Sequence, residues 1–317
     1  MMPFSLRRLR DSGVLGMNRR NAAYSLRCNP RSGYPLVDDK VLTKELARKH
    51  GIPAPSLYAV IERQHDISRL EQYLGEHSEF VVKPARGAGG AGIVLITGRR
   101  PEGFVRASGD LIPREDLAHH ISNILSGIFS LGGLPDRAIL ESLIHPAPVF
   151  ADVSYRGVPD IRIVAYCGVP VMGMVRLPTR TSDGKANLHR GAIGAGIDIR
   201  SGRTITAVHG SRIIAHHPDT RNPVSGIEVP EWKRMLLIAA RGLEITGLGY
   251  LGVDLVIDRD RGPLLLEMNA RPGLAIQLAN RAGLLQRLER VDASGDLKSL
   301  GAEERVAWAA EAFSASP

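Results

Sequence analysis

A glycine-rich segment at residues 87–92 (GAGGAG) restricts the fold of this chain more than any other feature. It satisfies the G-x-G-x-x-G pattern of dinucleotide-binding loops, in which the glycines open a helix directly after a strand. Here the glycines run instead into residues 93–96 (IVLI), an apolar run that indicates a strand. Residues 79–83 (EFVVK) indicate a second strand before the loop, so the sequence predicts a β-hairpin with a glycine-rich loop and excludes a Rossmann unit.

The same loop suits the binding of phosphate groups. Glycine lacks a Cβ, so the backbone N–H groups can lie directly against phosphate oxygens, and Lys83 at the foot of the loop adds a positive charge. With Val94 the pattern also matches the glycine-rich loop of protein kinases, but the chain contains no H-R-D or D-F-G triplet and no G-x-x-x-x-G-K-[ST] segment. The alternative, a structural turn, needs only about two to five residues. We therefore expect Gly87, Gly89 and Gly90 to cover a phosphate.

The composition is that of a globular protein without a membrane span. The 317 residues are 44% hydrophobic and 23% charged, and no stretch approaches the ~18 consecutive apolar residues that a spanning helix needs. Cys28 and Cys167 are the only cysteines, too few for a disulfide framework or a four-thiolate zinc site. The basic N-terminal segment lacks the apolar core of a secretory signal. We expect a cytoplasmic protein, with an organelle transit peptide as the alternative.

The formal net charge of +8 raises the question of nucleic-acid binding. Only seven of the 41 basic residues are lysines, and arginine pairs with the carboxylates and phosphates of small substrates as readily as with a nucleic-acid backbone. The alternative is that arginine is simply the prevalent surface cation of this chain. We expect small-molecule partners rather than nucleic acid, and the sequence makes no prediction of the oligomeric state.

The remaining segments predict an α+β protein of two lobes with antiparallel sheets. Residues 1–35 lack a sustained periodicity and are expected to form an irregular basic arm. A helix capped by Asp38 or Asp39 is expected to end at Gly51. Further helices are expected at 114–131 and 231–245, a polar loop at 178–196, a tail helix from about residue 292, and strands at 138–144, 151–155, 161–167, 169–177, 250–257 and 263–268.

Three side chains with oxygen donors on two neighbouring strands predict a magnesium site. Side chains alternate along a strand, so Glu267 and Asn269 point to the same face, and Asp254 lies on the expected partner strand. Carboxylate and amide oxygens are ligands that Mg²⁺ accepts together with the phosphates of a nucleotide. The alternative is that Glu267 ends a buried strand in an ion pair with Arg271.

Several short motifs together resemble those of the ATP-grasp superfamily, over residues 39 to 274. They are residues 39–40 (DK), 80–84 (FVVKP), 139–142 (ILES) and 267–273 (EMNARPG). Within the superfamily, residues 160–162 (DIR) and 187–191 (NLHRG) are similar to motifs of the RimK-type α-L-glutamate ligases. Two features depart from that group: only a short segment precedes the first helix, where a folded domain is usual, and Lys185 stands where arginine is usual.

The resemblance implies an ATP-grasp fold, in which two α+β lobes with antiparallel sheets grip the nucleotide. The domain that usually precedes this fold is then reduced to the arm at residues 1–35. The small lobe with the glycine-rich loop is expected at residues 36–140, the C-terminal lobe with the metal site at 141–291, and the tail helix at 292–317.

The resemblance also implies which residues bind ATP and metal. Glu141 and the backbone of residues 142–144 are expected at the adenine edge. The expected ATP contacts, besides the loop glycines, are Lys40, Lys83, Glu141, Ser142, Ile144, Asp160, Lys185 and Asn187. Asp254, Glu267 and Asn269 are expected to hold two Mg²⁺ ions, for which Mn²⁺ is an alternative.

The implied reaction is the ATP-dependent joining of a carboxylate to an amine, with an amino acid or peptide as substrate. The carboxylate attacks the γ-phosphate to give an acylphosphate, and the amine then displaces phosphate. Because carboxylate and triphosphate are both anionic, cations must neutralise the transferring group. The expected cations are Arg162, Arg176, Arg190 and Arg271, and for each the alternative is a structural salt bridge. The alternative functions are an ATP-grasp phosphotransferase or sugar-transfer-associated ligase, and a basic nucleic-acid-binding protein with an inactive nucleotide fold.

Overall fold

The computed structural model of the protein describes residues 11–87, 89–130 and 132–313, and in it the chain forms two compact units. The smaller unit comprises Asp38–Lys49 and Pro53–Ile144. The larger unit comprises residues 11–37, His50–Ile52 and residues 145–313. The lobe boundary expected at residue 140 therefore falls between residues 144 and 145, and the described part of the expected arm belongs to the larger unit.

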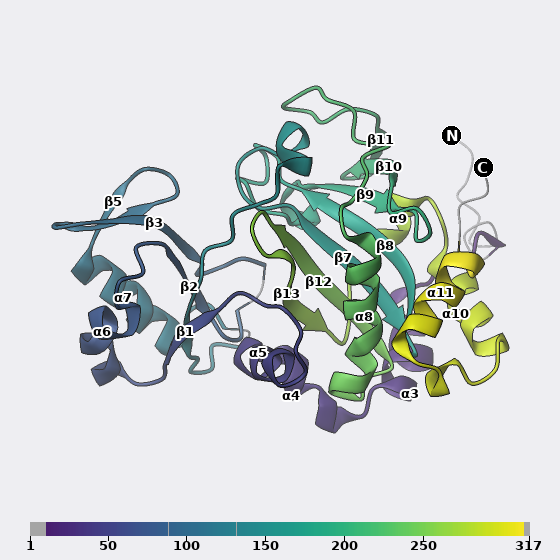
Figure 1. The fold of residues 1–317 in the computed structure, drawn as a ribbon, viewed down its shortest axis with the longest axis horizontal. Coiled ribbons are helices and arrows are strands. Elements are labelled where there is room, and N and C mark those ends of the chain that lie inside the picture. The colour runs from purple at the N-terminus through teal and green to yellow at the C-terminus, as the bar shows by residue number, and fades with distance from the viewer. Residues whose placement is uncertain (1–10, 88, 131, 314–317) are drawn as a thin grey trace. The chain divides into compact units, whose positions relative to one another are not determined.

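An antiparallel sheet forms the centre of the smaller unit (Figure 1). Among the described residues it has the strand order β1-β6-β2-β3-β4-β5. The strands are Leu57–Ile61 (β1), Phe80–Pro84 (β2), Val94–Arg100 (β3), Gly103–Arg106 (β4), Leu111–Pro113 (β5) and Ala138–Glu141 (β6). The helices are Lys40–Lys49 (α5), Leu70–Leu74 (α6) and Arg114–Leu125 (α7), with a 3-10 helix at Gln64–Arg69. Leu117, Ile121 and Ile124 of α7 recur at the spacing of one helix face and are fully buried in the same apolar cluster as Phe80 and Phe104.

The structure confirms the predicted hairpin and the predicted first helix. Strands β2 and β3 pair antiparallel, with Phe80 opposite Ile96, and the glycine-rich loop joins them. Helix α5 begins directly after Asp39, whose Oδ1 accepts a hydrogen bond from the backbone N–H of Val41 at 3.0 Å. This carboxylate is the expected helix cap, because it satisfies an N–H group that has no partner within the helix.

Two elements of the smaller unit end earlier than the sequence pattern predicts. Helix α7 ends at Leu125 because Gly127 takes a left-handed conformation (φ +87°) in which the chain turns away. A Cβ at Gly127 would lie 2.4 Å from the backbone oxygen of Leu134, so only glycine fits this close approach. The expected helix extended to residue 131, which lies outside the described residues. The strand expected at 138–144 ends at Glu141.

A second antiparallel sheet forms the centre of the larger unit (Figure 1). Among the described residues its strand order is β11-β10-β9-β8-β7-β12-β13. The strands are Asp160–Tyr166 (β7), Val169–Leu177 (β8), Ile193–Ile197 (β9), Thr204–His209 (β10), Arg212–Ile214 (β11), Tyr250–Asp258 (β12) and Gly262–Asn269 (β13). Four of these, β7, β8, β12 and β13, confirm strands predicted from the sequence.

Helices cover this sheet and complete the larger unit. They are Trp232–Thr246 (α8), Ile276–Asn280 (α9), Leu284–Ala293 (α10) and Ala302–Ala312 (α11), with 3-10 helices at Pro148–Val153, Leu188–Arg190 and Leu297–Ser299. Helix α8 confirms the helix predicted at 231–245 and packs on β7, β8, β12 and β13. It comes close to the sheet at Gly242, where a Cβ would lie 3.1 Å from the side chain of Leu251. None of the helices in the described part of the chain is long and apolar enough to span a membrane.

The strand predicted at residues 151–155 is wrong, because this segment begins in a 3-10 helix, Pro148–Val153. Proline at the first helical position has a backbone φ angle that already suits a helix. Phe150 and Val153 are both buried, and their separation of three residues matches the ~3 residues per turn of a 3-10 helix. The buried residues of this segment therefore follow the period of a 3-10 helix and not that of the predicted strand.

The prediction of an irregular N-terminal arm is wrong for its described part. Residues 17–38 form a succession of short helices: Met17–Arg19 (α2), a π-helix at Arg20–Ser25, Leu26–Cys28 (α3), a 3-10 helix at Arg31–Gly33 and Pro35–Asp38 (α4). Their changing pitch explains why no single periodicity was visible. Leu15 and Tyr24 are buried in the larger unit. The Asn29 side chain accepts from the backbone N–H of Tyr250 and donates to its carbonyl oxygen, both at 2.8 Å, as a neighbouring strand would.

The turn between β12 and β13 yields a testable dependence of stability on pH. Asp258 accepts hydrogen bonds from the Arg261 guanidinium at 2.8 Å and from the backbone N–H of His145 and Asp260, each at 3.1 Å. Burial alone would raise the pKa of Asp258, but these partners lower it to about 2. Since the pKa in the folded state is below the unfolded value of about 3.9, the stabilisation is present above pH ~4 and is lost as the pH falls toward 2.

We therefore expect Asp258→Asn to lower the free energy of unfolding by about 2 kcal/mol at pH 7 and to flatten its decline between pH 4 and pH 2. Urea denaturation at a series of pH values measures both effects. Asp260→Asn, in the same turn but exposed, is the matched control and should behave like the wild type. Equal pH profiles for the wild type and Asp258→Asn would contradict the assignment.

Candidate active site

A buried group of one carboxylate and two ammonium groups lies in the smaller unit. Glu141 at the end of β6 contacts Lys83 of the neighbouring strand β2, with 2.5 Å between Oε1 and Nζ, and Lys44 of α5, with 2.6 Å between Oε2 and Nζ. All three side chains are less than a tenth exposed. Burial would raise the pKa of Glu141, but the two ammonium groups outweigh it and lower the pKa. The three side chains together carry one positive charge, which favours an anion nearby.

The glycine-rich loop is held at its base by close backbone contacts. Lys40 donates a hydrogen bond from Nζ to the backbone oxygen of Gly87 at 2.8 Å. A Cβ at Gly87 would lie 2.3 Å from Cγ of Pro84, so only glycine fits there. Gly89 and Gly90 have φ angles of +64° and +74°, a left-handed conformation that favours glycine. The loop therefore has the backbone expected of a phosphate-binding loop, and its binding of phosphate stays a prediction.

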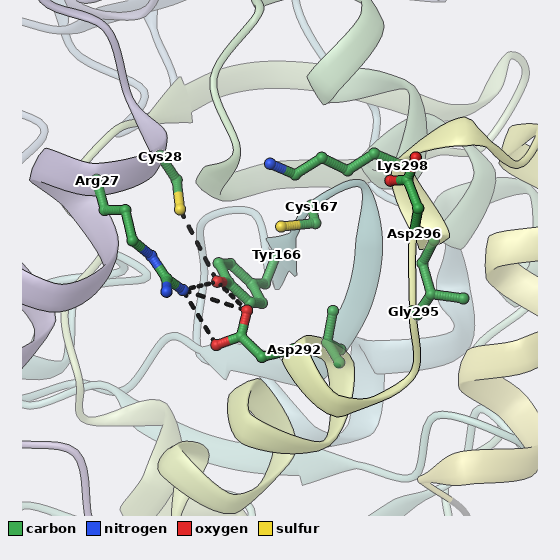
Figure 2. Close-up of a pocket in the computed structure, with 10 residues that line it drawn as sticks. Arg27, Cys28, Tyr166, Cys167, Asp292, Gly295, Asp296 and Lys298 are labelled. Carbon is green, nitrogen blue, oxygen red and sulfur yellow. Dashed lines mark hydrogen bonds and ion pairs between the residues drawn. The ribbon is translucent and has the colours of Figure 1, made fainter.

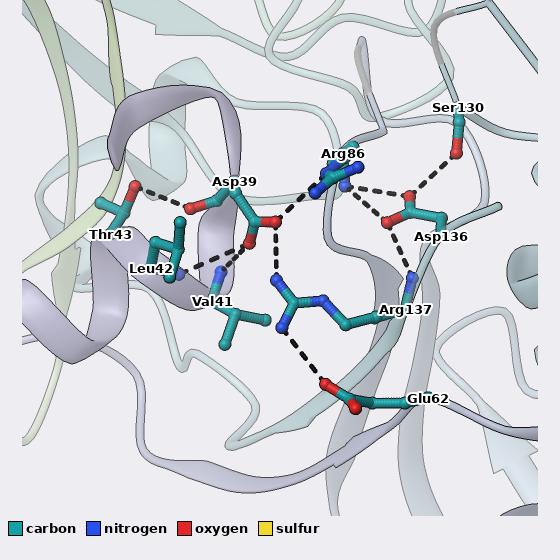
Figure 3. A network of polar contacts seen from close by, with 9 residues as sticks. All are labelled: Asp39, Val41, Leu42, Thr43, Glu62, Arg86, Ser130, Asp136 and Arg137. Carbon is teal, nitrogen blue, oxygen red and sulfur yellow. Dashed lines mark hydrogen bonds and ion pairs between the residues drawn. The ribbon is translucent and has the colours of Figure 1, made fainter. Parts of the chain in front are cut away.

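A network of two carboxylates and two arginines anchors the same loop (Figure 3). Asp39 Oδ2 accepts from Nε of Arg86 at 3.2 Å and from Nη2 of Arg137 at 2.6 Å. Asp136 accepts from the backbone N–H of Arg86 at 2.9 Å and from the Ser130 hydroxyl at 3.0 Å. The network ties the start of α5 and the segment before β6 to Arg86, the residue that precedes the glycines. It fixes the end of the loop that precedes the glycines.

In the larger unit, charged residues face one another across the four adjacent strands β8, β7, β12 and β13. The registers place Asp160 of β7 opposite Arg176 of β8, Arg162 of β7 opposite Asp254 of β12, and Asp254 opposite Glu267 of β13. Residues directly opposite one another in adjacent strands point to the same face of the sheet. The sheet therefore gathers five charged side chains on one face.

These side chains form a connected set of ion pairs. Arg162 binds both oxygens of Asp254, with Nε–Oδ1 at 2.7 Å and Nη2–Oδ2 at 2.5 Å. Arg176 binds both oxygens of Asp160 and also reaches Oδ2 of Asp254 from Nη2 at 3.0 Å. Such two-point contacts between guanidinium and carboxylate fix orientation as well as distance. Asp254 is only 1% exposed and is thus the buried centre of the set.

The two aspartates of this set differ in their readiness to ionise. Burial would raise the pKa of Asp254, but Arg162 and Arg176 lower it below its usual range. Burial raises the pKa of Asp160, against the effect of Arg176, and the negative charge of Asp254 raises it further. Asp254 is therefore the ionised member, and Asp160 takes up a proton more readily.

Glu267 and Asn269 lie beside Asp254, as predicted from the alternation along β13. The Asn269 amide nitrogen Nδ2 is 3.3 Å from Oδ2 of Asp254 and 3.3 Å from Oε1 of Glu267. The Glu267 carboxyl is also within hydrogen-bonding reach of Asp254. Two carboxylates side by side attract a cation. Carboxylate and amide oxygens suit a hard cation, so the donor set fits Mg²⁺.

The structure places four other predicted residues in different surroundings. The Arg271 guanidinium lies over the ring of Tyr34, 4.8 Å from its centroid. Lys185 Nζ is 3.6 Å from the exposed carboxylate of Asp183.

Asn187 caps the 3-10 helix Leu188–Arg190, because its Oδ1 accepts a hydrogen bond from the backbone N–H of His189 at 2.9 Å. Arg190 ends that helix, and its side chain is exposed. Of the remaining predicted residues, Ser142 accepts at Oγ from the backbone N–H of Ser56 at 3.0 Å, and Ile144 is half-buried.

Sequence reasoning missed the contribution of Lys44 and of the pair Asp136 and Arg137. A signal for Lys44 was present, because it lies three residues after Val41 and three before Ala47, both buried on the inner face of α5. A lysine on the apolar face of a helix requires a buried anionic partner. No comparable signal marks Asp136 and Arg137, whose partners are distant in the sequence.

The fold is that of an ATP-grasp protein, as predicted. The sequence matches the family described as sugar-transfer associated ATP-grasp over residues 19–293, which is most of the chain, and the protein belongs to that family. The superfamily inferred from the motifs is therefore confirmed. The finer resemblance to RimK-type ligases stays a prediction.

Solved structures similar to this chain include several ATP-grasp enzymes. The ligase PsnB in complex with a minimal precursor is 15% identical, with a TM-score of 0.45, over 84% of this chain and 63% of that chain. D-cycloserine synthetase DcsG is 18% identical, with a TM-score of 0.44, over 81% and 70%. D-alanyl-alanine synthetase A from Vibrio cholerae is 13% identical, with a TM-score of 0.44, over 90% and 67%. This chain thus spans less than two thirds of the PsnB chain. None of the curated proteins compared with the chain matches it.

The buried ion pairs of the smaller unit yield a prediction about stability. Lys44→Met keeps the length and apolar stem of the side chain but leaves Glu141 with Lys83 as its ammonium partner. We expect the free energy of unfolding to fall by about 2–4 kcal/mol, because a buried carboxylate loses half of its compensation. Lys49→Met, on the exposed face of the same helix, should change it by less than about 0.5 kcal/mol. Urea denaturation followed by circular dichroism measures both, and equal effects would contradict the buried role.

Proposed function

We propose that the protein is an ATP- and Mg²⁺-dependent ligase that joins a carboxylate to an amine through an acylphosphate. The observation that carries this proposal is the set of Asp254, Glu267 and Asn269 on adjacent strands, with partly buried arginines bound to Asp254, in a chain of the ATP-grasp family. The oxygen donors suit a hard cation, and the family membership supports ATP as the nucleotide that brings the phosphates.

In this proposal Asp254, Glu267 and Asn269 hold Mg²⁺, which when bound neutralises charge on the phosphate groups. The arginines keep the donors in place. Arg162 holds Asp254 at two points, and Arg176 links Asp254 to Asp160, so a change at either arginine displaces the carboxylate. Asp160 is proposed to contact the nucleotide.

The smaller unit supplies the proposed contacts to the rest of ATP. Lys40, Lys83 and the backbone N–H groups of Gly87, Gly89 and Gly90 bind phosphate oxygens. The Lys83 ammonium has three N–H donors, so its ion pair with Glu141 leaves donors for a phosphate. Because both Glu141 oxygens bind lysines, we assign the adenine edge to the backbone of residues 142–144 and give the Glu141 side chain the role of positioning Lys83.

The proposed reaction has two steps. The substrate carboxylate attacks the γ-phosphate of ATP to form an acylphosphate and ADP, and the amine then attacks the acyl carbon and releases phosphate. Positive side chains must stabilise the charge that develops in both steps. We assign this role to Arg190 and Arg271, whose side chains are exposed, with Lys185 and Asn187 near the nucleotide. Arg162 and Arg176 add positive charge but are committed to the aspartates.

The family match favours a second candidate within the same chemistry. The description of the family associates it with sugar transfer. This supports a substrate whose carboxylate or amine is carried on a sugar, as an alternative to a free amino acid or a peptide. Both candidates use the same residues for ATP and metal and differ only in the acceptor or donor.

Glu267→Gln tests the metal site. The variant keeps the size of the side chain but removes its charge, and we expect Mg²⁺-dependent ADP release to fall about 100-fold or more, because charge neutralisation at the phosphates is lost. The assay follows ADP release with amino acids, peptides and amino sugars as substrates. Glu303→Gln on the exposed face of α11 is the matched control and should keep full activity. A folded Glu267→Gln protein with wild-type turnover would overturn the metal assignment.

Hydroxylamine tests the acylphosphate. When it replaces the amine, a ligase of this kind should form a hydroxamate of the substrate carboxylate in step with ADP release, and Glu267→Gln should form almost none. A phosphotransferase would instead release ADP and leave a phosphorylated product without hydroxamate. Detection of the hydroxamate by mass spectrometry also identifies the carboxylate substrate.

A further inference from the structure

A pocket of about 350 Å³ in the larger unit brings the two cysteines of the chain together (Figure 2). Cys28 ends helix α3, and Cys167 lies in the tight turn between β7 and β8. The polar side chains around them are Arg27, Tyr166, Asp292, Asp296 and Lys298. We call this the dithiol pocket. None of its residues belongs to the proposed ATP and metal sites, so it needs a separate explanation.

The backbone holds both cysteines in place through one residue. Gly249 donates a hydrogen bond from its N–H to the carbonyl oxygen of Cys28 at 2.9 Å, and its own carbonyl oxygen accepts from the N–H of Cys167 at 2.7 Å. A Cβ at Gly249 would lie 3.0 Å from Cβ of Cys28. Glycine at this position therefore lets α3 approach the turn. Both cysteine side chains line the same pocket (Figure 2).

The side chains of the pocket favour a thiolate at Cys28. Its sulfur atom lies 3.8 Å from the Tyr166 hydroxyl, which also contacts the Arg27 guanidinium (Figure 2). Asp292 balances this group by accepting from Tyr166 at 2.7 Å and pairing with Arg27 at 3.0 Å. The neighbouring Cys167 lowers the pKa of the Cys28 thiol, and Tyr166 and Arg27 lower it further, whereas Cys28 and burial raise the pKa of Cys167.

Solvent exposure also makes Cys28 the more reactive of the two cysteines. Cys28 is partly exposed, whereas Cys167 is buried. A reagent that enters the pocket therefore meets Cys28 first, and Cys28 is also the more nucleophilic sulfur because the thiolate is the reactive form of cysteine. Cys167 is the only other cysteine of the chain, it lines the same pocket, and its backbone is tied to that of Cys28 through Gly249.

We propose that the dithiol pocket is a modification site at which a peroxide oxidises Cys28 and Cys167 resolves the product into an intramolecular disulfide. In the first step the Cys28 thiolate attacks one oxygen of hydrogen peroxide, the O–O bond breaks, and a sulfenic acid and hydroxide form. In the second step the Cys167 sulfur attacks the sulfenic acid sulfur, an S–S bond forms, and the hydroxyl leaves as water with the thiol proton. Peroxide is reduced by two electrons, and the thiol pair is oxidised by two.

The disulfide would join α3 covalently to the turn between β7 and β8. In the reduced protein α3 is held to the larger unit by noncovalent contacts, among them those of Arg27 and Cys28 in this pocket and of the neighbouring Asn29. An oxidised protein would keep this segment attached even where such contacts break.

The full-length protein treated with hydrogen peroxide tests the proposal. We expect an intact mass lower by two hydrogen atoms, a peptide map that links Cys28 to Cys167, and reversal of both by dithiothreitol. Thermal unfolding should occur at a higher temperature in the oxidised than in the reduced protein, because the link restricts the unfolded chain. Two free thiols after exposure to excess peroxide would overturn the proposal, as would disulfides that form only between different molecules.

Single variants assign the roles of the two cysteines. In Cys167→Ser, oxidation should stop at the sulfenic acid of Cys28, which dimedone traps as a thioether. In Cys28→Ser, the buried Cys167 should stay reduced under the same conditions. Tyr166→Phe keeps the ring and removes the hydroxyl, and it should slow the alkylation of Cys28 by iodoacetamide at neutral pH. If dimedone labels Cys167 in Cys28→Ser as fast as it labels Cys28 in Cys167→Ser, the assigned roles are wrong and the proposal is contradicted.

Discussion

The ion pairs of the buried carboxylate of Asp254 fix the strand register in the larger unit. A carboxylate this deep in a sheet is stable only if cations reach it, and Arg162 and Arg176 approach it from two neighbouring strands. These contacts exist in one register of β7, β8 and β12, because a slip of a single residue would turn each side chain to the opposite face. The same register places Glu267 opposite Asp254. The need to compensate the buried charge of Asp254 therefore fixes both the register of the strands and the position of Glu267 beside Asp254.

The smaller unit also buries a carboxylate beside two cations, but the net charge of its group is positive. There a buried carboxylate, Glu141, is outnumbered by two lysines, so the group is left attractive to anions, whereas the set around Glu267 and Asn269 is suited to a cation. A metal-bound triphosphate needs both kinds of partner. Each unit therefore has a charge imbalance of its own, positive around Glu141 and negative around Glu267.

Much of this arrangement follows from local patterns in the sequence. The alternation along a strand was enough to place Glu267 beside Asn269, and the glycine run between two apolar segments was enough to predict the hairpin. Contacts between distant segments were not predictable in this way. The ion pair between Lys44 and Glu141 depends on how α5 packs on its sheet. The N-terminal helices are stabilised by packing on the larger unit and show no periodicity of their own.

The path of the chain has a consequence for biosynthesis. The larger unit is discontinuous, since its N-terminal helices precede the smaller unit and its sheet follows it. As the ribosome delivers the polypeptide in order, the six-stranded sheet can close before the strand that accepts Asn29 has been made. Until the sheet of the larger unit is synthesised, the N-terminal helices have no surface to pack against, and apolar residues such as Tyr24 stay exposed to solvent. A nascent chain of this protein thus has an interval in which shielding by a chaperone would matter most.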